Sequence, residues 1–78
     1  MGKLKMLVWS EWKTEAIASC PYRIILHKKG KEFVTHIQCD STDGIYEVSG
    51  NYFQTLEDAE KDFETRCSSY GIECPITT

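Results

Sequence analysis

Two histidines and four cysteines are the residues of this 78-residue chain whose types could do catalysis or bind a metal. His27 and His36 fall in two successive segments of alternating character, where we expect them on one face of a β-hairpin as diagonal neighbours roughly 7–8 Å apart. That separation is too large for direct contact between their β-carbons, although both rings can reach a shared ligand. We expect solvated or interface histidines here, with a metal or catalytic pair as the alternative.

The cysteines do not follow a metal-binding pattern. Cys20, Cys39, Cys67 and Cys74 are separated by 18, 27 and 6 residues, whereas zinc sites usually contain a C-x-x-C or a close Cys/His pair. The chain has neither the apolar core of a signal peptide nor the roughly 20 apolar residues of a membrane span. We therefore expect a cytoplasmic protein with reduced structural thiols, leaving disulfides or a metal site as alternatives.

Catalytic motifs are absent from the sequence, which contains no glycine-rich phosphate loop, no H-E-x-x-H and no G-x-S-x-G. A Cys–His dyad would require Cys20 or Cys39 to be exposed beside a histidine. A chain of 78 residues also has little material for the walls of a deep pocket. We expect no enzyme activity, no cofactor and no metal.

One helix is predicted over residues 55–71. Thr55 is a typical N-cap, Asp58 takes the capping-box position three residues later, and Gly71 can adopt the left-handed conformation after the last turn. Between them, spacings of three and four residues define one apolar stripe. The stripe consists of Leu56, Ala59, Phe63, Cys67 and Tyr70.

The segment before the helix predicts an antiparallel meander. Residues 22–28 and 32–39 alternate, and a two-residue turn at Gly30 and Lys31 pairs 28 with 33, 26 with 35 and 24 with 37. A third strand is expected over 44–49, ended by Gly50 and Asn51. Residues 5–9 can add a strand at the sheet edge. Residues 10–19 can form a short helix, and a strand over 14–20 is the alternative, but we expect an irregular or short extended segment that ends at Pro21. The predicted fold is a single α+β domain over 1–78, with three to four strands and a C-terminal helix packed on one face of the sheet.

The face of the sheet away from the helix is a candidate interface because a single helix covers only one side. The residues expected on it are more apolar than a purely solvated face requires. They include Ile25, His27, Val34, His36 and, from the third strand, Tyr46. Trp9 and Trp12 also have no obvious place in so small a core, and aromatic residues commonly anchor interfaces.

Charge is unevenly distributed along the chain, whose net charge is −3. Basic residues dominate the first half, including Lys28, Lys29 and Lys31 at the predicted hairpin turn. Acidic residues dominate the second half, and the polar face of the predicted helix has a row of them. This row includes Glu57, Asp58, Glu60 and Glu64. The net charge disfavours a general nucleic-acid-binding domain, which is usually basic.

Residues 50–59, with Phe63, Arg66 and the preceding 32–36, resemble small accessory proteins of phages and mobile elements in size and layout. Anti-CRISPR proteins are the best-known example. The resemblance implies a compact α+β domain that inhibits a host protein by masking its surface, and it implies no roles for individual residues.

We therefore predict a non-catalytic protein-binding domain that acts as an inhibitor. Its acidic helix would place carboxylates where a host defence protein with a basic surface binds phosphates. The contacts would come from that helix, the open sheet face, or both. The alternative is a small nucleic-acid-binding domain that uses the basic hairpin. No membrane partner is expected, and homodimerisation stays open because small cores have little net stability.

Overall fold

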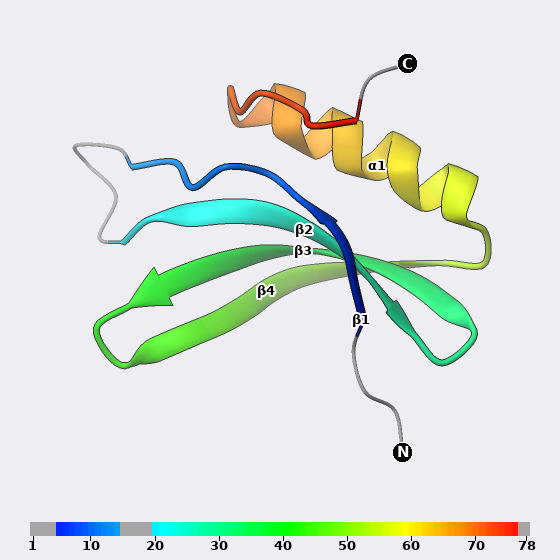
Figure 1. Ribbon diagram of the computed structural model, residues 1–78, viewed down its shortest axis with the longest axis horizontal. Helices are drawn as coiled ribbons and strands as arrows, with labels where there is room; N and C mark the ends of the chain where they lie inside the picture. The colour runs from blue at the N-terminus through cyan, green and yellow to red at the C-terminus, as the bar shows by residue number, and fades with distance from the viewer. Residues whose placement is uncertain (1–4, 15–19, 77–78) are drawn as a thin grey trace.

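The computed structural model describes residues 5–14 and 20–76, and these form a four-stranded sheet with one helix on it. The strands are β1 (Lys5–Trp9), β2 (Tyr22–Lys29), β3 (Glu32–Ser41) and β4 (Gly44–Phe53), and the helix is α1 (Leu56–Ser69). The sheet is an antiparallel meander in the order β1-β2-β3-β4, and α1 lies across one face of it (Figure 1). The predicted fold class is confirmed. No helix within the described ranges is long and apolar enough to cross a membrane.

The hairpin of β2 and β3 has the predicted register, with Lys28 opposite Phe33 and Ile24 opposite Ile37. Gly30 takes the left-handed conformation (φ 62°) that this tight turn requires. Because side chains alternate across a strand, this register puts the apolar row of both strands on the side facing α1.

Helix α1 begins and ends as the sequence predicts. Thr55 is the N-cap, and its hydroxyl accepts a hydrogen bond of 3.2 Å from the backbone N–H of Asp58. Gly71, with φ 67°, reverses the chain after the helix. The buried members of the stripe are Ala59, Phe63 and Cys67, whereas Leu56 and Tyr70 are each 40% exposed at its two ends. The core consists of these buried residues packed on Ile24 and Leu26 of β2, with Ile72 after the helix.

The expected end of the third strand at Gly50 and Asn51 is wrong, because β4 continues to Phe53. The chain accommodates the break as a β-bulge: Ile37 pairs with Val48 but Thr35 pairs with Asn51, which leaves an extra residue on β4. Ser49 lies in this bulge with φ 56°. The Arg66 side chain donates a 2.5 Å hydrogen bond to the carbonyl of Ser49, so α1 contacts the bulge directly.

The bulge also makes the expected position of Tyr46 wrong. With β4 shifted by one residue, Tyr46 pairs with Cys39 and lies on the helix side of the sheet. It does not share a face with His27 and His36.

The predicted edge strand over residues 5–9 is confirmed as β1, which pairs antiparallel with β2. The short-helix alternative for the following segment is wrong for its described part. Ser10 and Lys13 instead continue along β2 through backbone hydrogen bonds from Ser10 N–H to Ile24 O and from Lys13 N–H to Tyr22 O. The rest of that prediction, on residues 15–19, lies outside the described residues.

Candidate interaction surface

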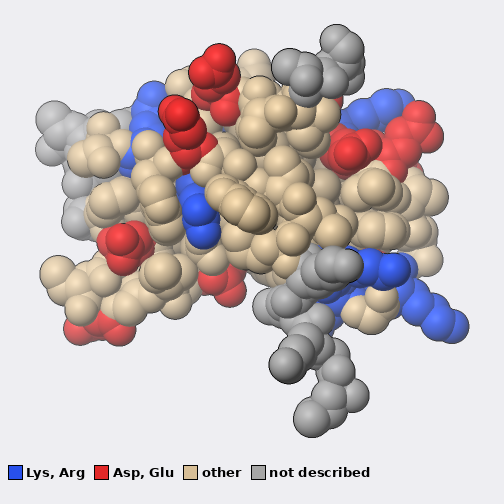
Figure 2. Space-filling view, viewed as in Figure 1, with Lys and Arg blue, Asp and Glu red and all other residues tan. Residues whose placement is uncertain are grey.

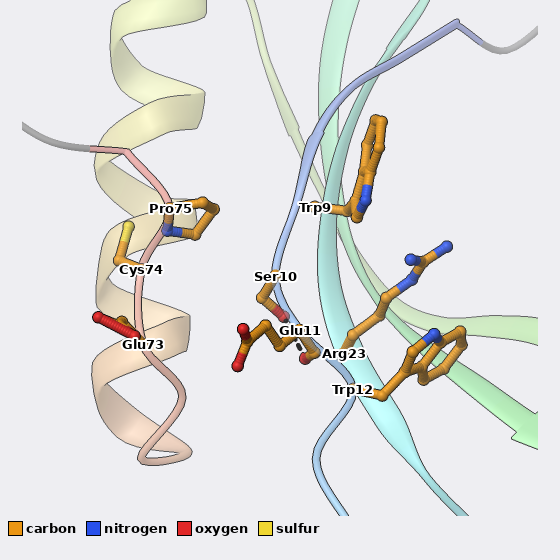
Figure 3. Close-up of a pocket in the computed structure, with 8 residues that line it drawn as sticks. All are labelled: Trp9, Ser10, Glu11, Trp12, Arg23, Glu73, Cys74 and Pro75. Carbon is orange, nitrogen blue, oxygen red and sulfur yellow. Dashed lines mark hydrogen bonds between the residues drawn. The ribbon is translucent and has the colours of Figure 1, made fainter.

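Arg23 lies between two exposed tryptophans on the face of the sheet away from α1 (Figure 3). Its guanidinium carbon is 4.4 Å from the ring centroid of Trp12 and 6.0 Å from that of Trp9. Trp9 is 49% exposed and Trp12 is 38% exposed. A guanidinium over indole faces is a favourable cation–π arrangement, so the three side chains form one ordered group. We call these three residues the Trp–Arg cluster.

Hydrogen bonds across the sheet fix the position of Arg23. Its Nε donates to Oε1 of Gln38 on β3 at 2.7 Å, and Nε2 of Gln38 donates to Oε2 of Glu47 on β4 at 3.0 Å. Gln38, the middle member of this chain of bonds, is buried, whereas Arg23 is half-buried and Glu47 is exposed. Burial lowers the pKa of Arg23 from its ordinary value, but a guanidinium remains charged in proteins.

A hollow of about 450 Å³ adjoins the cluster. It lies between the segment that follows β1 and the segment that follows α1, and its lining includes Glu11, Glu73, Cys74 and Pro75. Figure 3 shows Glu11 reaching from the first segment toward the second, while Trp9, Arg23 and Trp12 lie on the other side of the first segment. The lining of the hollow therefore includes both acidic and aromatic residues, with the Glu11 side chain and the two indole rings on opposite sides of the segment that follows β1.

Ser10 anchors the segment that bears Glu11 and Trp12. Its hydroxyl accepts a 2.9 Å hydrogen bond from the N–H of Ile24 and donates one of 3.0 Å to the carbonyl of Glu11. Ser10 is buried, so these bonds hold the chain against β2 where the tryptophans are displayed. The cluster is thus preorganised by backbone pairing and side-chain bonds together.

The other residues predicted for this face are mostly buried. Ile25, His27 and Val34 are each at most 2% exposed, which contradicts the expectation of an open apolar face. The register gives the reason, because Ile25 lies between Trp9 and His36, and Val34 lies between His27 and Tyr52. Cross-strand neighbours of this size pack over smaller side chains.

His27 and His36 are diagonal neighbours as predicted, and their rings contact each other directly. Nε2 of His27 is 2.7 Å from Nδ1 of His36, and the rings stack with centroids 4.9 Å apart. Tyr52 meets His36 edge-on at 6.5 Å. Nδ1 of His27 is buried and has no hydrogen-bond partner among the described residues.

Both histidines favour the neutral form. Burial is the main cause that lowers the pKa of each, and the nearby charge of His36 lowers the pKa of His27 further. Glu47 acts in the opposite direction on both. Within the described residues, no group of three or more His, Cys, Asp or Glu side chains is placed to hold a metal ion.

The cysteine thiols and the two histidine rings lie on different faces of the sheet. Cys39 pairs with Tyr22 and so faces the helix side, opposite to His27 and His36. Burial raises the pKa of Cys39, and it raises the pKa of Cys67 to about 12. Neither thiol has the depressed pKa of a catalytic nucleophile.

The predicted acidic row on α1 is partly exposed. Glu57 and Asp58 are exposed, whereas Glu60 and Glu64 are half-buried. Asp62 makes structural hydrogen bonds within the fold. Its Oδ2 accepts hydrogen bonds from Thr35 Oγ1 at 2.5 Å, Asn51 Nδ2 at 3.2 Å and Arg66 Nε at 3.2 Å.

Opposite charges lie at the same end of the molecule. In Figure 2 basic side chains gather around the β2–β3 turn, and acidic side chains lie nearby around the start of α1. Lys28, Lys29 and Lys31 are exposed at that turn. Each group therefore weakens the field of the other, which reduces long-range attraction of either a basic protein or a nucleic acid.

Sequence reasoning did not identify the Trp–Arg cluster. Two features of the sequence pointed to this cluster: two tryptophans without a place in the core, and Arg23 on the outer row of β2. The missing information was the path of residues 10–13, which decides whether Trp12 reaches Arg23.

No known family model, curated protein or solved structure gives a significant match to this chain. The likeness to phage accessory proteins therefore rests on size and layout alone.

Proposed function

We propose that this chain is a non-catalytic protein-binding domain whose contact surface centres on the Trp–Arg cluster. The main observation is the stacking of Arg23 between the exposed Trp9 and Trp12. Tryptophan and arginine are the residue types most enriched among those that dominate binding energy in protein interfaces.

The order of the cluster supports this proposal. Gln38 and Glu47 hold Arg23, and backbone pairing holds the segment that bears Trp12, so a partner would meet side chains already in place. Binding then costs less conformational entropy than it would on mobile side chains. The two exposed indole rings lie on either side of Arg23 as one patch, and a contiguous exposed apolar patch is a usual sign of a contact site.

Charge suggests the chemistry of the partner. The exposed carboxylates of Glu11 and Glu73 line the hollow beside the cluster. A partner with an apolar patch for the indole rings and a basic side chain for the hollow would complement both features. Inhibition of a host protein by masking its nucleic-acid-binding surface is one specific form of this proposal, because such surfaces are basic.

The test is affinity capture from a lysate of the source cells, comparing the wild type with Trp12→Ala. Leu56→Ala is a matched control, because Leu56 is 40% exposed and Trp12 is 38% exposed, and Leu56 lies at the start of α1. We expect one stoichiometric protein that the wild type and the control retain and that Trp12→Ala loses. Unchanged thermal unfolding of both variants would exclude misfolding as the cause.

Two further variants separate the competing surfaces. Reversal of Glu57, Glu60 and Glu64 to lysine should leave capture intact, and loss of the partner there would move the site to the acidic row of α1. Truncation of Lys28, Lys29 and Lys31 to alanine should also have little effect. Recovery of nucleic acid alone, lost after nuclease treatment and after that truncation, would favour the nucleic-acid function instead.

A further inference from the structure

The four cysteines assemble into two pairs in the folded chain. Cys39 on β3 lies opposite Tyr22, and the hydrogen bond of 3.0 Å from Asp40 N–H to Pro21 O extends this pairing toward Cys20. Cys20 is two residues before Tyr22, so it shares a face with Cys39 and lies diagonal to it. Burial is the main cause that raises the pKa of Cys39, and the neighbouring Cys20 thiol raises it further.

The second pair forms where the chain turns back after α1. Gly71 reverses the backbone, and Ile72 N–H donates a 2.8 Å hydrogen bond to the carbonyl of Cys67. The following segment then runs back along the helix, as Figure 1 shows. Cys74 on this segment packs against the core cluster that contains Cys67, and after burial the neighbouring Cys74 thiol is the next cause that raises the pKa of Cys67.

We propose that Cys20–Cys39 and Cys67–Cys74 are two dithiol pairs, each of which closes to a disulfide in the folded protein under oxidising conditions. In the structure all four cysteines are free. Each thiol already has its partner as a neighbour, so closure needs side-chain rotation and a small shift of the chain rather than a new fold. Cys20 precedes β2 and Cys74 follows α1, and these segments can make such a shift more easily than the ladder or the helix.

The oxidant is a small-molecule disulfide such as oxidised glutathione. In each pair a half-buried thiol reacts first. Its thiolate attacks one sulfur of oxidised glutathione, breaks the S–S bond of that molecule and releases the first reduced glutathione. Its partner thiolate then attacks the protein sulfur of this mixed disulfide and releases the second. Each pair thus loses two hydrogens to form one S–S bond, while one oxidised glutathione becomes two reduced molecules. Because Cys67 is buried, Cys74 meets the oxidant first in its pair.

The two bonds would tie down different parts of the molecule. Cys67–Cys74 would fix the segment that forms one wall of the hollow, with Glu73 and Pro75 in it. Cys20–Cys39 would join the start of β2 to β3 across a loop of 18 residues. Both restrict the unfolded chain, so the oxidised protein should unfold at a temperature about 10 °C or more above the reduced protein.

Trypsin mapping after incubation of the native protein with oxidised glutathione tests the pairing. Cleavage after lysine and arginine places Cys20 in peptide 14–23, Cys39 in peptide 32–61, and both Cys67 and Cys74 in peptide 67–78. We expect 14–23 linked to 32–61, and 67–78 lighter by about 2 Da through an internal disulfide. The whole protein should lose about 4 Da.

Oxidation in strong denaturant is the matched control, because four cysteines in an unfolded chain give a mixture of all three pairings. The variants Cys20→Ser and Cys74→Ser should each lose one predicted link and keep the other. The proposal would be overturned by a link between 67–78 and either other peptide in the native sample. Glutathione adducts without internal links, or native thiols that stay reduced while the denatured chain oxidises, would overturn it equally.

Discussion

The buried His27 stacks on the half-buried His36, and the charge state of this pair is linked to folding. Burial lowers the pKa of both rings, so the folded protein resists protonation at a pH where the unfolded chain accepts it. The contribution of this pair to stability is therefore complete above a pH of about 6.5, the ordinary histidine pKa. It is lost as the pH falls toward the lowered pKa values of the folded state.

We accordingly expect urea unfolding to show a lower free energy of unfolding for the wild type at pH 5.5 than at pH 7.5. Glu47 opposes the effect, whereas the positive charges of Lys29 and Arg66 reinforce it. His27→Gln removes one titrating ring and should show a smaller loss over the same range. Equal losses in the two proteins would contradict the assignment.

Gly50 is required at its position by the ring of His36. A β-carbon built at Gly50 would lie 2.5 Å from Nε2 and 3.0 Å from Cδ2 of that ring. Gly50→Ala should therefore displace His36 and cost about 1–3 kcal/mol in chemical denaturation, as overpacking usually does. In a His36→Ala background the same substitution should cost little, and an undiminished cost there would show that the clash is not with this ring.

At the scale of elements, the attachment of α1 to the sheet depends on Phe63. Its side chain is fully buried in the core cluster, whereas Leu56 on the same stripe is 40% exposed. We expect Phe63→Ala to cost about 3–5 kcal/mol and Leu56→Ala much less, measured by urea unfolding. Similar values for both would refute the packing of α1 through the centre of its stripe.

Asp62 provides the polar part of the same attachment. One carboxylate oxygen accepts hydrogen bonds from β3, β4 and α1 through Thr35, Asn51 and Arg66. Asp62→Ala should cost about 1–3 kcal/mol because it leaves these donors unpaired. Glu57 is exposed on the same helix, so Glu57→Ala should change the free energy of unfolding by no more than about 0.5 kcal/mol.

How far the sequence predicts these elements depends on whether a local pattern decides them. Thr55, the apolar stripe and Gly71 act within the helix itself, and the turn at Gly30 sets the β2–β3 register, so all were predictable. The bulge beside Gly50 was not, because a glycine in a strand pattern indicates either an end or an extra residue. That one residue reverses the face of residues 44–48, which explains the error at Tyr46.

At the scale of the whole molecule, we expect stability to come from apolar packing and not from covalent or metal links. The cysteines are free, and the core is an apolar cluster between α1 and the sheet. We expect cooperative thermal unfolding, followed by circular dichroism, to persist in excess reductant and in excess chelator. A lower midpoint with chelator would indicate a structural metal, and loss of cooperativity with reductant would indicate obligatory disulfides.

The order of the strands has a consequence for how the chain folds. Each strand pairs with its neighbour in sequence, so the sheet needs only short loop closures, and its contact order is low for a β-structure. The hairpin of β2 and β3, with its two-residue turn, can close within about 1–10 μs. Helix α1 follows all four strands, so it leaves the ribosome after them. Until it docks, Ile24, Leu26 and Phe33 face water, and the nascent sheet is most exposed to chaperones in that interval.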